Sequence, residues 1–126
     1  MPNKTSLLIK AIKRGDVIFA DDLIRKRIDI DTRDSNGWPP IYHAVVHGQK
    51  RIIQLLIDAG VDINRRNNTY ALYLAVIGGQ LNIIEMLLNL GAIQYPVSGI
   101  PLIKCVPRHL KNAEAIRKLL ESHAGD

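Results

Sequence analysis

The chain repeats itself at an offset of about 33 residues, and this period constrains the fold more than any other feature of the sequence. The segment LIDAGVDINRRN, residues 56 to 67, has the same register as LIRKRIDIDTRD, residues 23 to 34. Ala44 and Gly48 recur as Ala75 and Gly79 in the next unit. A fixed period of this length is typical of proteins that stack small supersecondary units, because one unit alone cannot bury its apolar face.

Each unit has the same internal pattern. It consists of a short apolar helix, a glycine turn, a second helix rich in Ile and Leu, and a polar extended connection. Gly48 and Gly60 stand where the left-handed end of a helix usually requires glycine. Asn36 and Gly37 form the strongest short turn signal in the chain. The sequence therefore predicts an all-α fold in which helical hairpins alternate with projecting turns.

The second unit, DSNGWPPIYHAVVHGQKRIIQLLIDAGVDINRR at 34 to 66, resembles an ankyrin repeat. The positions that match the pattern of that family are Asp34, Gly37, Pro40, Ala44, Gly48, Leu56, Gly60, Asp62 and Asn64. The resemblance covers essentially the whole chain as four units, at about 4–33, 34–66, 67–95 and 98–125. It implies a single domain with the fold of an ankyrin-type helical repeat solenoid, in which the first and last units act as caps.

The chain departs from the family pattern at several positions. Pro39 and Tyr42 replace the Thr and His that help to hold the turn by hydrogen bonds in the family. The third unit lacks two turn residues, so its projecting loop is expected to be shorter. Pro107 falls within the first helix of the fourth unit, and we expect it to cut that helix short.

The two ends have the polar character of caps. Charged side chains accompany the second helix of the first unit and surround an apolar stripe on the last helix. Stacked arrays need such polar outer faces for solubility. We therefore expect the sequence to be a complete array and not a fragment, and a monomer when unbound.

Composition narrows the functional class. Cys105 is the sole cysteine, so an internal disulfide is excluded and the cytoplasm is the expected location. Lys10, Lys13 and Arg14 interrupt any signal-peptide apolar region. The apolar stretch 71–93 contains Gln80 and Glu85, so we interpret it as buried repeat core and not as a membrane span.

The catalytic and metal-binding patterns in the sequence are weak. His43 and His47 are one helical turn apart, but the Glu of the catalytic zinc pattern is absent. Cys105 and His109 have the same spacing in a unit too distant to complete a zinc site. Cys105 aligns with the small buried alanines of the other units, so a packed thiol is expected. We predict no enzyme activity, no metal and no cofactor.

A partner is expected on the turn tips and on the exposed side of the first helices, which is the surface that the family resemblance implies. The candidate residues are Arg33, Asp34, Asn36, Trp38, Val46, His47, Arg65, Arg66, Asn68, Tyr70 and Ile77. Trp38 and the two arginines at 65 and 66 are residue types enriched at interface hot spots. Two alternatives stay open: Trp38 covers the neighbouring turn, or the arginine pair is a solvated tip.

The sequence thus predicts a non-enzymatic module that occupies another protein. The net charge of +5 favours a partner with an acidic surface. An inhibitor or a toxin-neutralising immunity protein is slightly favoured over an adaptor, because the chain shows no other functional part. Nucleic-acid binding is the alternative, which the nearly neutral middle units disfavour.

Overall fold

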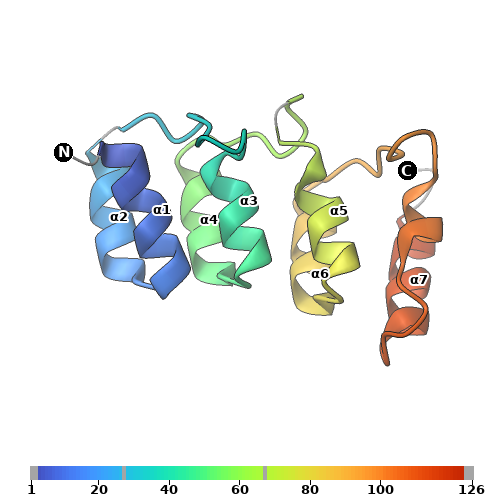
Figure 1. Ribbon diagram of the computed structural model, residues 1–126. Helices are drawn as coiled ribbons and strands as arrows, with labels where there is room; N and C mark the ends of the chain where they lie inside the picture. Colours follow the sequence, from blue (N-terminus) through green and yellow to red (C-terminus); the bar gives the residue numbers. More distant parts are fainter. Residues whose placement is uncertain (1–2, 27, 67, 124–126) are drawn as a thin grey trace. The chain divides into compact units, whose positions relative to one another are not determined.

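The computed structural model describes residues 3–26, 28–66 and 68–123. Its regular elements are helices that follow one another in pairs (Figure 1). They are α1 (Lys4–Arg14), α2 (Val17–Arg25), α3 (Pro40–Val46), α4 (Lys50–Asp58), α5 (Tyr70–Ile77), α6 (Leu81–Asn89), the 3-10 helix η1 (Leu102–Cys105) and α7 (Ala113–Ser122). In these three ranges the extended backbone pairs only at the isolated bridge between Val97 and Ile100. The predicted all-α repeat of helical hairpins is confirmed.

The chain divides into two compact units, Met1–Asn68 and Thr69–Asp126. The first contains α1 to α4, and the second contains α5, α6, η1 and α7. The prediction of a single domain with capping ends stays a prediction.

The core of the first unit lies between two helical hairpins. α1 packs against α2 and α3, and α4 packs against α2 and α3. Leu8, Ile12, Ile53 and Leu56 are completely buried there. Burial of each such side chain stabilises the fold by about 1.5 to 3 kcal/mol. The small Ala44 is also fully buried, which lets neighbouring helices approach closely.

The second unit has its own core. α5 packs against α6 and η1, while α7 packs against α6 and η1. Ile84, Leu87, Ile116 and Leu120 are completely buried. Asn112 Nδ2 donates to the Gly79 carbonyl oxygen at 2.9 Å, so the entry to α7 is tied to the turn between α5 and α6.

Glycine ends the helices as the sequence predicts. Gly48 and Gly60 have φ values of 64° and 111°, in the left-handed region. After α3 the Gln49 amide donates to the Ala44 carbonyl at 2.9 Å, and after α4 the Val61 amide donates to Leu56 at 3.0 Å. These bonds satisfy carbonyl groups that the helix itself leaves unpaired.

The irregular repeats also follow from local sequence. The connection from Asp58 to Tyr70 is shorter than the one from Arg25 to Pro40, as the missing turn residues predict. In the fourth repeat the first helix is reduced to η1, which ends before Pro107, so the predicted truncation is confirmed. Pro107 has no amide hydrogen to continue a helix.

The expectation of a fully packed thiol at Cys105 is wrong. Cys105 is half-buried, whereas Ala44 and Ala75 are completely buried. Its Sγ contacts the Pro101 carbonyl oxygen at 3.6 Å. The alignment of Cys105 with the buried alanines fails because η1 is a short 3-10 helix, which turns its side chains by a different angle per residue.

Candidate protein-binding surface

The turn that precedes α3 is held by the carboxylate of Asp34. Its Oδ1 accepts hydrogen bonds from the amides of Asn36 at 2.9 Å and Trp38 at 3.0 Å. The backbone closes the same loop, since the Asp34 amide donates to the Trp38 carbonyl and the Gly37 amide donates to the Asp34 carbonyl. A short polar side chain that accepts from amides farther along the chain is the usual means of fixing such a turn.

The other oxygen of this carboxylate binds a buried ring. His43 Nε2 donates to Asp34 Oδ2 at 2.6 Å, and the His43 side chain is almost fully buried. Because His43 lies in the middle of α3, the bond joins the projecting turn to the helix that follows. The repeat pattern points to position 42 for this role, so sequence reasoning missed His43.

The environment keeps Asp34 ionised. Burial alone would raise its pKa. The hydrogen bonds that the carboxylate accepts, first from the Trp38 amide and then from the His43 ring, outweigh burial and lower the pKa below its ordinary value. The turn is therefore built around a carboxylate anion.

Trp38 packs on the base of this turn. Its ring lies edge-on to Tyr42, with centroids 5.8 Å apart, and is tilted against His43 at 5.3 Å. The indole is half-buried. Both contacts are to α3 of the same repeat, and part of the ring stays exposed.

The arginines lie at the outer ends of the two turns in the first unit. Arg33, Arg65 and Arg66 are all exposed. Arg65 reaches across to the preceding turn, where its Nη1 lies 3.8 Å from Asp31 Oδ2. An exposed pair of this kind contributes only about 0 to 1 kcal/mol, so the guanidinium keeps most of its capacity for another partner.

Asn68 is buried and stabilises the second turn. It is almost fully buried, its Nδ2 donates to the Asp62 carbonyl at 2.8 Å, and its amide donates to the Arg65 carbonyl at 2.7 Å. Asn68 therefore shapes the second turn, and we leave it out of the contact surface.

The remaining candidates lie away from the turns. Val46 and His47 are exposed at the other end of α3, about 10 Å along the helix axis from its first residue. His47 Nδ1 donates to the His43 carbonyl at 3.0 Å. In the second unit, Tyr70 begins α5 and its ring is tilted against that of Tyr73, with centroids 6.0 Å apart. Ile77 ends the same helix, and Tyr70 and Ile77 are both exposed.

The distribution of metal-ligating side chains and the apolar character of the helices also describe this surface. In the ranges 3–26, 28–66 and 68–123, His, Cys, Asp and Glu side chains nowhere gather in a group of three or more that could hold a metal ion. No helix within those ranges has the length and apolar character needed to cross a membrane.

Comparison with known proteins agrees with this geometry. A family model described as ankyrin repeats, in three copies, matches residues 2–67. The mouse 2-5A-dependent ribonuclease is 39% identical over 67 residues, which are 52% of this chain and 9% of that protein. The Medicago truncatula protein VAPYRIN-LIKE is 37% identical over 62 residues, 49% of this chain and 13% of that protein.

A bacterial relative gives the same result. The ankyrin repeat protein YahD of Escherichia coli is 36% identical over 59 residues, which are 47% of this chain and 29% of that protein. In each of these relatives the match spans less than a third of the relative's length. The family model covers more than half of the present chain, and the chain therefore belongs to the ankyrin repeat family, whose repeats are protein–protein interaction modules.

Proposed function

We propose that the chain binds another protein through the turn tips of its first unit, and that it acts by covering the partner's surface. The observation that carries the proposal is the pairing of a rigid turn with exposed cations. The turn from Asp34 to Trp38 is fixed by the hydrogen bonds to one carboxylate, and Arg33, Arg65 and Arg66 are exposed beside the two tips. A preformed surface loses little conformational entropy when it binds.

The charge of this surface indicates the partner. Arginine binds carboxylates with two parallel hydrogen bonds, and it is enriched at interface hot spots. The part of Trp38 that stays accessible adds rigid aromatic area at the same tip. An acidic protein surface fits these side chains best.

The mode of action that we propose is inhibition or neutralisation. Ankyrin repeats supply a contact surface, and binding through it produces an effect when the covered surface is one that the partner needs. We further propose that the protein acts as a monomer in the cytoplasm, where the single Cys105 would stay reduced.

Affinity purification from the native host, followed by quantitative mass spectrometry, tests the proposal. The bait is the full chain, compared with the double variant Arg33→Glu and Arg66→Glu. The matched control is Lys50→Glu with Arg51→Glu, which reverses two exposed charges at the start of α4, away from the turn tips. We expect at least one protein to copurify with wild type and control, and to fall at least tenfold with the tip variant.

The copurified protein is then produced alone, and its affinity and its own activity are measured with and without the chain. Inhibition at stoichiometric amounts supports the proposal. If the tip variant and the control variant recover equal amounts of the partner, the turn tips are not the binding surface. Recovery of nucleic acid with a steep dependence on salt would instead favour the nucleic-acid alternative.

A further inference from the structure

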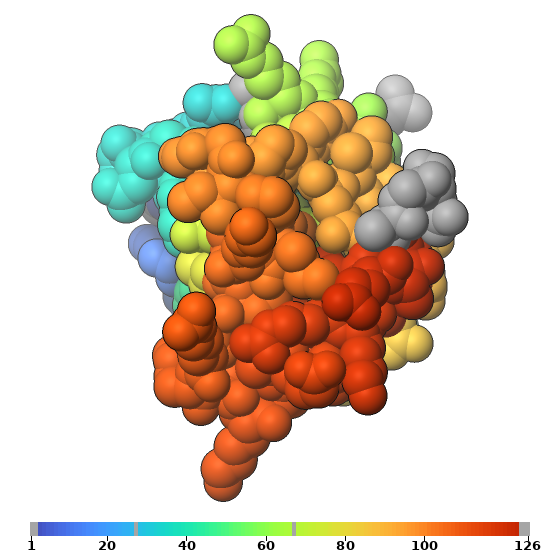
Figure 2. Space-filling view, turned by 90° about the vertical axis from the view of Figure 1, so that its right-hand side faces the viewer, coloured from blue at the N-terminus to red at the C-terminus, as the bar shows by residue number. Residues whose placement is uncertain are grey.

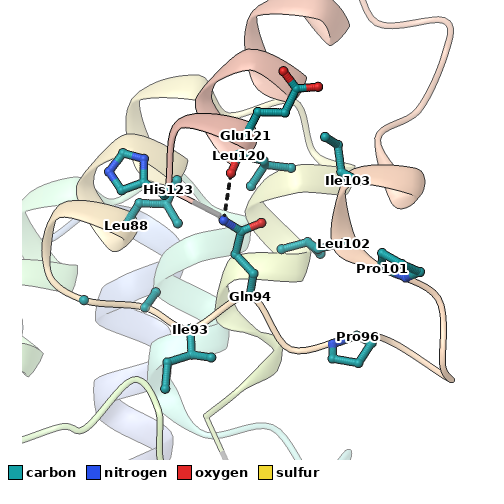
Figure 3. Close-up of a pocket in the computed structure, with 12 residues that line it drawn as sticks. Leu88, Ile93, Gln94, Pro96, Pro101, Leu102, Ile103, Leu120, Glu121 and His123 are labelled. Atoms are coloured by element: carbon teal, nitrogen blue, oxygen red, sulfur yellow. Dashed lines mark hydrogen bonds between the residues drawn. The ribbon is translucent and has the colours of Figure 1, made fainter. Parts of the chain in front are cut away.

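The second unit contains an apolar groove that lies between the connection after α6, the start of η1 and the end of α7 (Figure 3). It has a volume of about 740 Å³, and Ile103 is among its lining residues. Gln94 Nε2 donates to the Leu120 carbonyl at 2.9 Å, which ties two of its walls together. Glu121 places one carboxylate on a lining that is otherwise mostly apolar, so the groove does not select one class of ligand. The turn before α3 in the first unit carries a more specific chemistry.

Asn36 and Gly37 form a dipeptide that can react within its own backbone. The amide nitrogen of the residue after an asparagine can attack the side-chain carbonyl carbon, which closes a five-membered succinimide ring. Glycine favours this attack, because it has no Cβ to hinder the ring and its backbone is the most permissive. This chemistry is one reason why asparagine is a thermolabile residue. Of all the asparagines in the sequence, Asn36 alone precedes a glycine.

The reactive dipeptide lies at the surface. Asn36 and Gly37 are both exposed in the turn that precedes α3. Figure 2 shows the chain around this turn, in cyan, at the molecular surface. A Cβ at Gly37 would meet no atom within 4 Å, so neighbouring groups leave room for ring closure. Water, which is needed to open the ring afterwards, has access to the same place.

The turn also restrains the reaction. The Gly37 amide supplies the nucleophilic nitrogen, and it donates to the Asp34 carbonyl at 2.9 Å. The Asn36 amide donates to Asp34 Oδ1 at 2.9 Å, while His43 binds the other oxygen of that carboxylate. The nitrogen can attack only after it has left the Asp34 carbonyl and lost its proton, so the turn has to open first. The frequency of this local opening therefore sets the rate.

We propose that Asn36 is a site of slow, spontaneous deamidation, and that the turn held by Asp34 controls its rate. The Gly37 nitrogen forms a bond to Asn36 Cγ, the bond from Cγ to the side-chain nitrogen breaks, and that nitrogen leaves as ammonia with the proton that Gly37 loses. Water then adds to either carbonyl of the succinimide and gives aspartate or isoaspartate. One water is consumed, one ammonia is released, and no electrons are transferred.

Either product changes the tip of the first unit. A new carboxylate enters a turn beside the exposed Arg33. Isoaspartate also adds one carbon to the main chain between Asp34 and Trp38, so the turn cannot keep the same set of hydrogen bonds. The modification itself goes beyond the proposed function. Its expected effect on binding, a weaker hold on an acidic partner, rests on the proposed function.

The rate is measured on the full chain, incubated at mildly alkaline pH and then digested. Liquid chromatography with mass spectrometry separates the peptides that carry asparagine, aspartate and isoaspartate at position 36. We expect wild type to convert at least tenfold more slowly than the same chain unfolded in urea. Asn82, which is exposed in α6 and precedes Ile83, is the internal reference and should stay unmodified in the folded chain. Asn36→Gln should stop conversion at this position, because glutamine would have to form a larger ring.

Asp34→Ala should speed conversion of Asn36 at least threefold, since the turn opens more often without the carboxylate. Gly60→Ala is the matched control, because it is expected to destabilise the first unit to a similar degree and lies outside the turn. It should change the rate much less than Asp34→Ala does. Equal acceleration by the two variants would overturn the role of the turn. An unmodified Asn36 in every folded variant, while the urea-unfolded chain converts, would overturn the site itself.

These measurements need no partner, so they remain decisive if the proposed function fails. The effect on binding is tested separately, with Asn36→Asp and Asn36→Gln as baits in the affinity purification. We expect Asn36→Asp to recover severalfold less of the copurified protein than Asn36→Gln does. Equal recovery would overturn the effect on binding.

Discussion

His43 Nε2 lies 2.6 Å from Asp34 Oδ2, so a buried ring in α3 anchors the first residue of a projecting turn. The same carboxylate accepts from the amides of Asn36 and Trp38. Conformational order at the tip therefore depends on one side chain, which connects the surface proposed for binding to the core of the first unit.

Asp34→Ala should destabilise the first unit by about 1 to 3 kcal/mol, because it leaves the buried His43 ring and two amides without their acceptor. Chemical denaturation measures the loss. Hydrogen exchange at the Trp38 amide should become faster as well. Asp31→Ala is the control, since it removes an exposed side-chain pair with Arg65 and should cost about 0 to 1 kcal/mol. Equal losses in the two variants would contradict the anchoring role.

Acid should remove the contribution of Asp34. Its pKa is lowered in the folded protein, so the stability that the carboxylate provides is fully present above its unfolded pKa of about 3.9. That stability is lost as the pH falls through the lower pKa of the folded state. The difference in unfolding free energy between wild type and Asp34→Asn should therefore shrink as the pH falls below about 4. A difference that grows below about pH 4 would show that the sign is wrong.

Gly60→Ala should destabilise the protein by about 1 to 2 kcal/mol through the backbone alone. Gly60 has a φ of 111°, and a Cβ at this position would meet no atom within 4 Å. Gly60→Asn should cost less, because asparagine tolerates positive φ better than alanine. Thermal or urea unfolding of the two variants checks this order, and the reverse order would indicate a steric cause.

Leu56→Ala should cost about 2 to 5 kcal/mol, as expected for a cavity in a close-packed core. Leu56 is completely buried in α4. Leu90→Ala is the matched control, since Leu90 is partly exposed after α6, and its loss should stay below about 1 kcal/mol. Urea denaturation of both variants measures the difference. Similar losses would mean that Leu56 is not in a tightly packed environment.

Asn112→Ala should destabilise the second unit by about 1 kcal/mol, because the Gly79 carbonyl loses the donor that ties it to the entry of α7. Asn82→Ala, at an exposed position in α6, should have a smaller effect. The rate of amide hydrogen exchange along α7 measures the effect locally. It should increase in Asn112→Ala and remain unchanged in Asn82→Ala.

The repeat period predicts the helical hairpins because their determinants are local. Glycine at positions such as 48 and 60 ends helices by backbone conformation, and Pro107 cuts a helix by its missing amide. These helix ends are determined by residues adjacent in the sequence, so they can be predicted from the sequence alone. The truncated first helix of the fourth repeat is predictable for the same reason.

The site was only partly predictable because it depends on pairings between residues. Asn68 is polar and close to a turn tip, which favours exposure, yet its amide group satisfies backbone atoms of the turn and is buried. His43 stands one position after the expected histidine, so the pattern gives no sign that it binds Asp34. The groove beside Ile103 depends on the spacing between η1 and α7, which a repeat pattern does not specify.

Trp38 is the single tryptophan of the chain, and its ring lies against His43 at the tip of the first unit. Its intrinsic emission is therefore a built-in optical probe of one location. A change in emission wavelength or intensity on adding a candidate partner would report contact or rearrangement at that turn, without any attached dye.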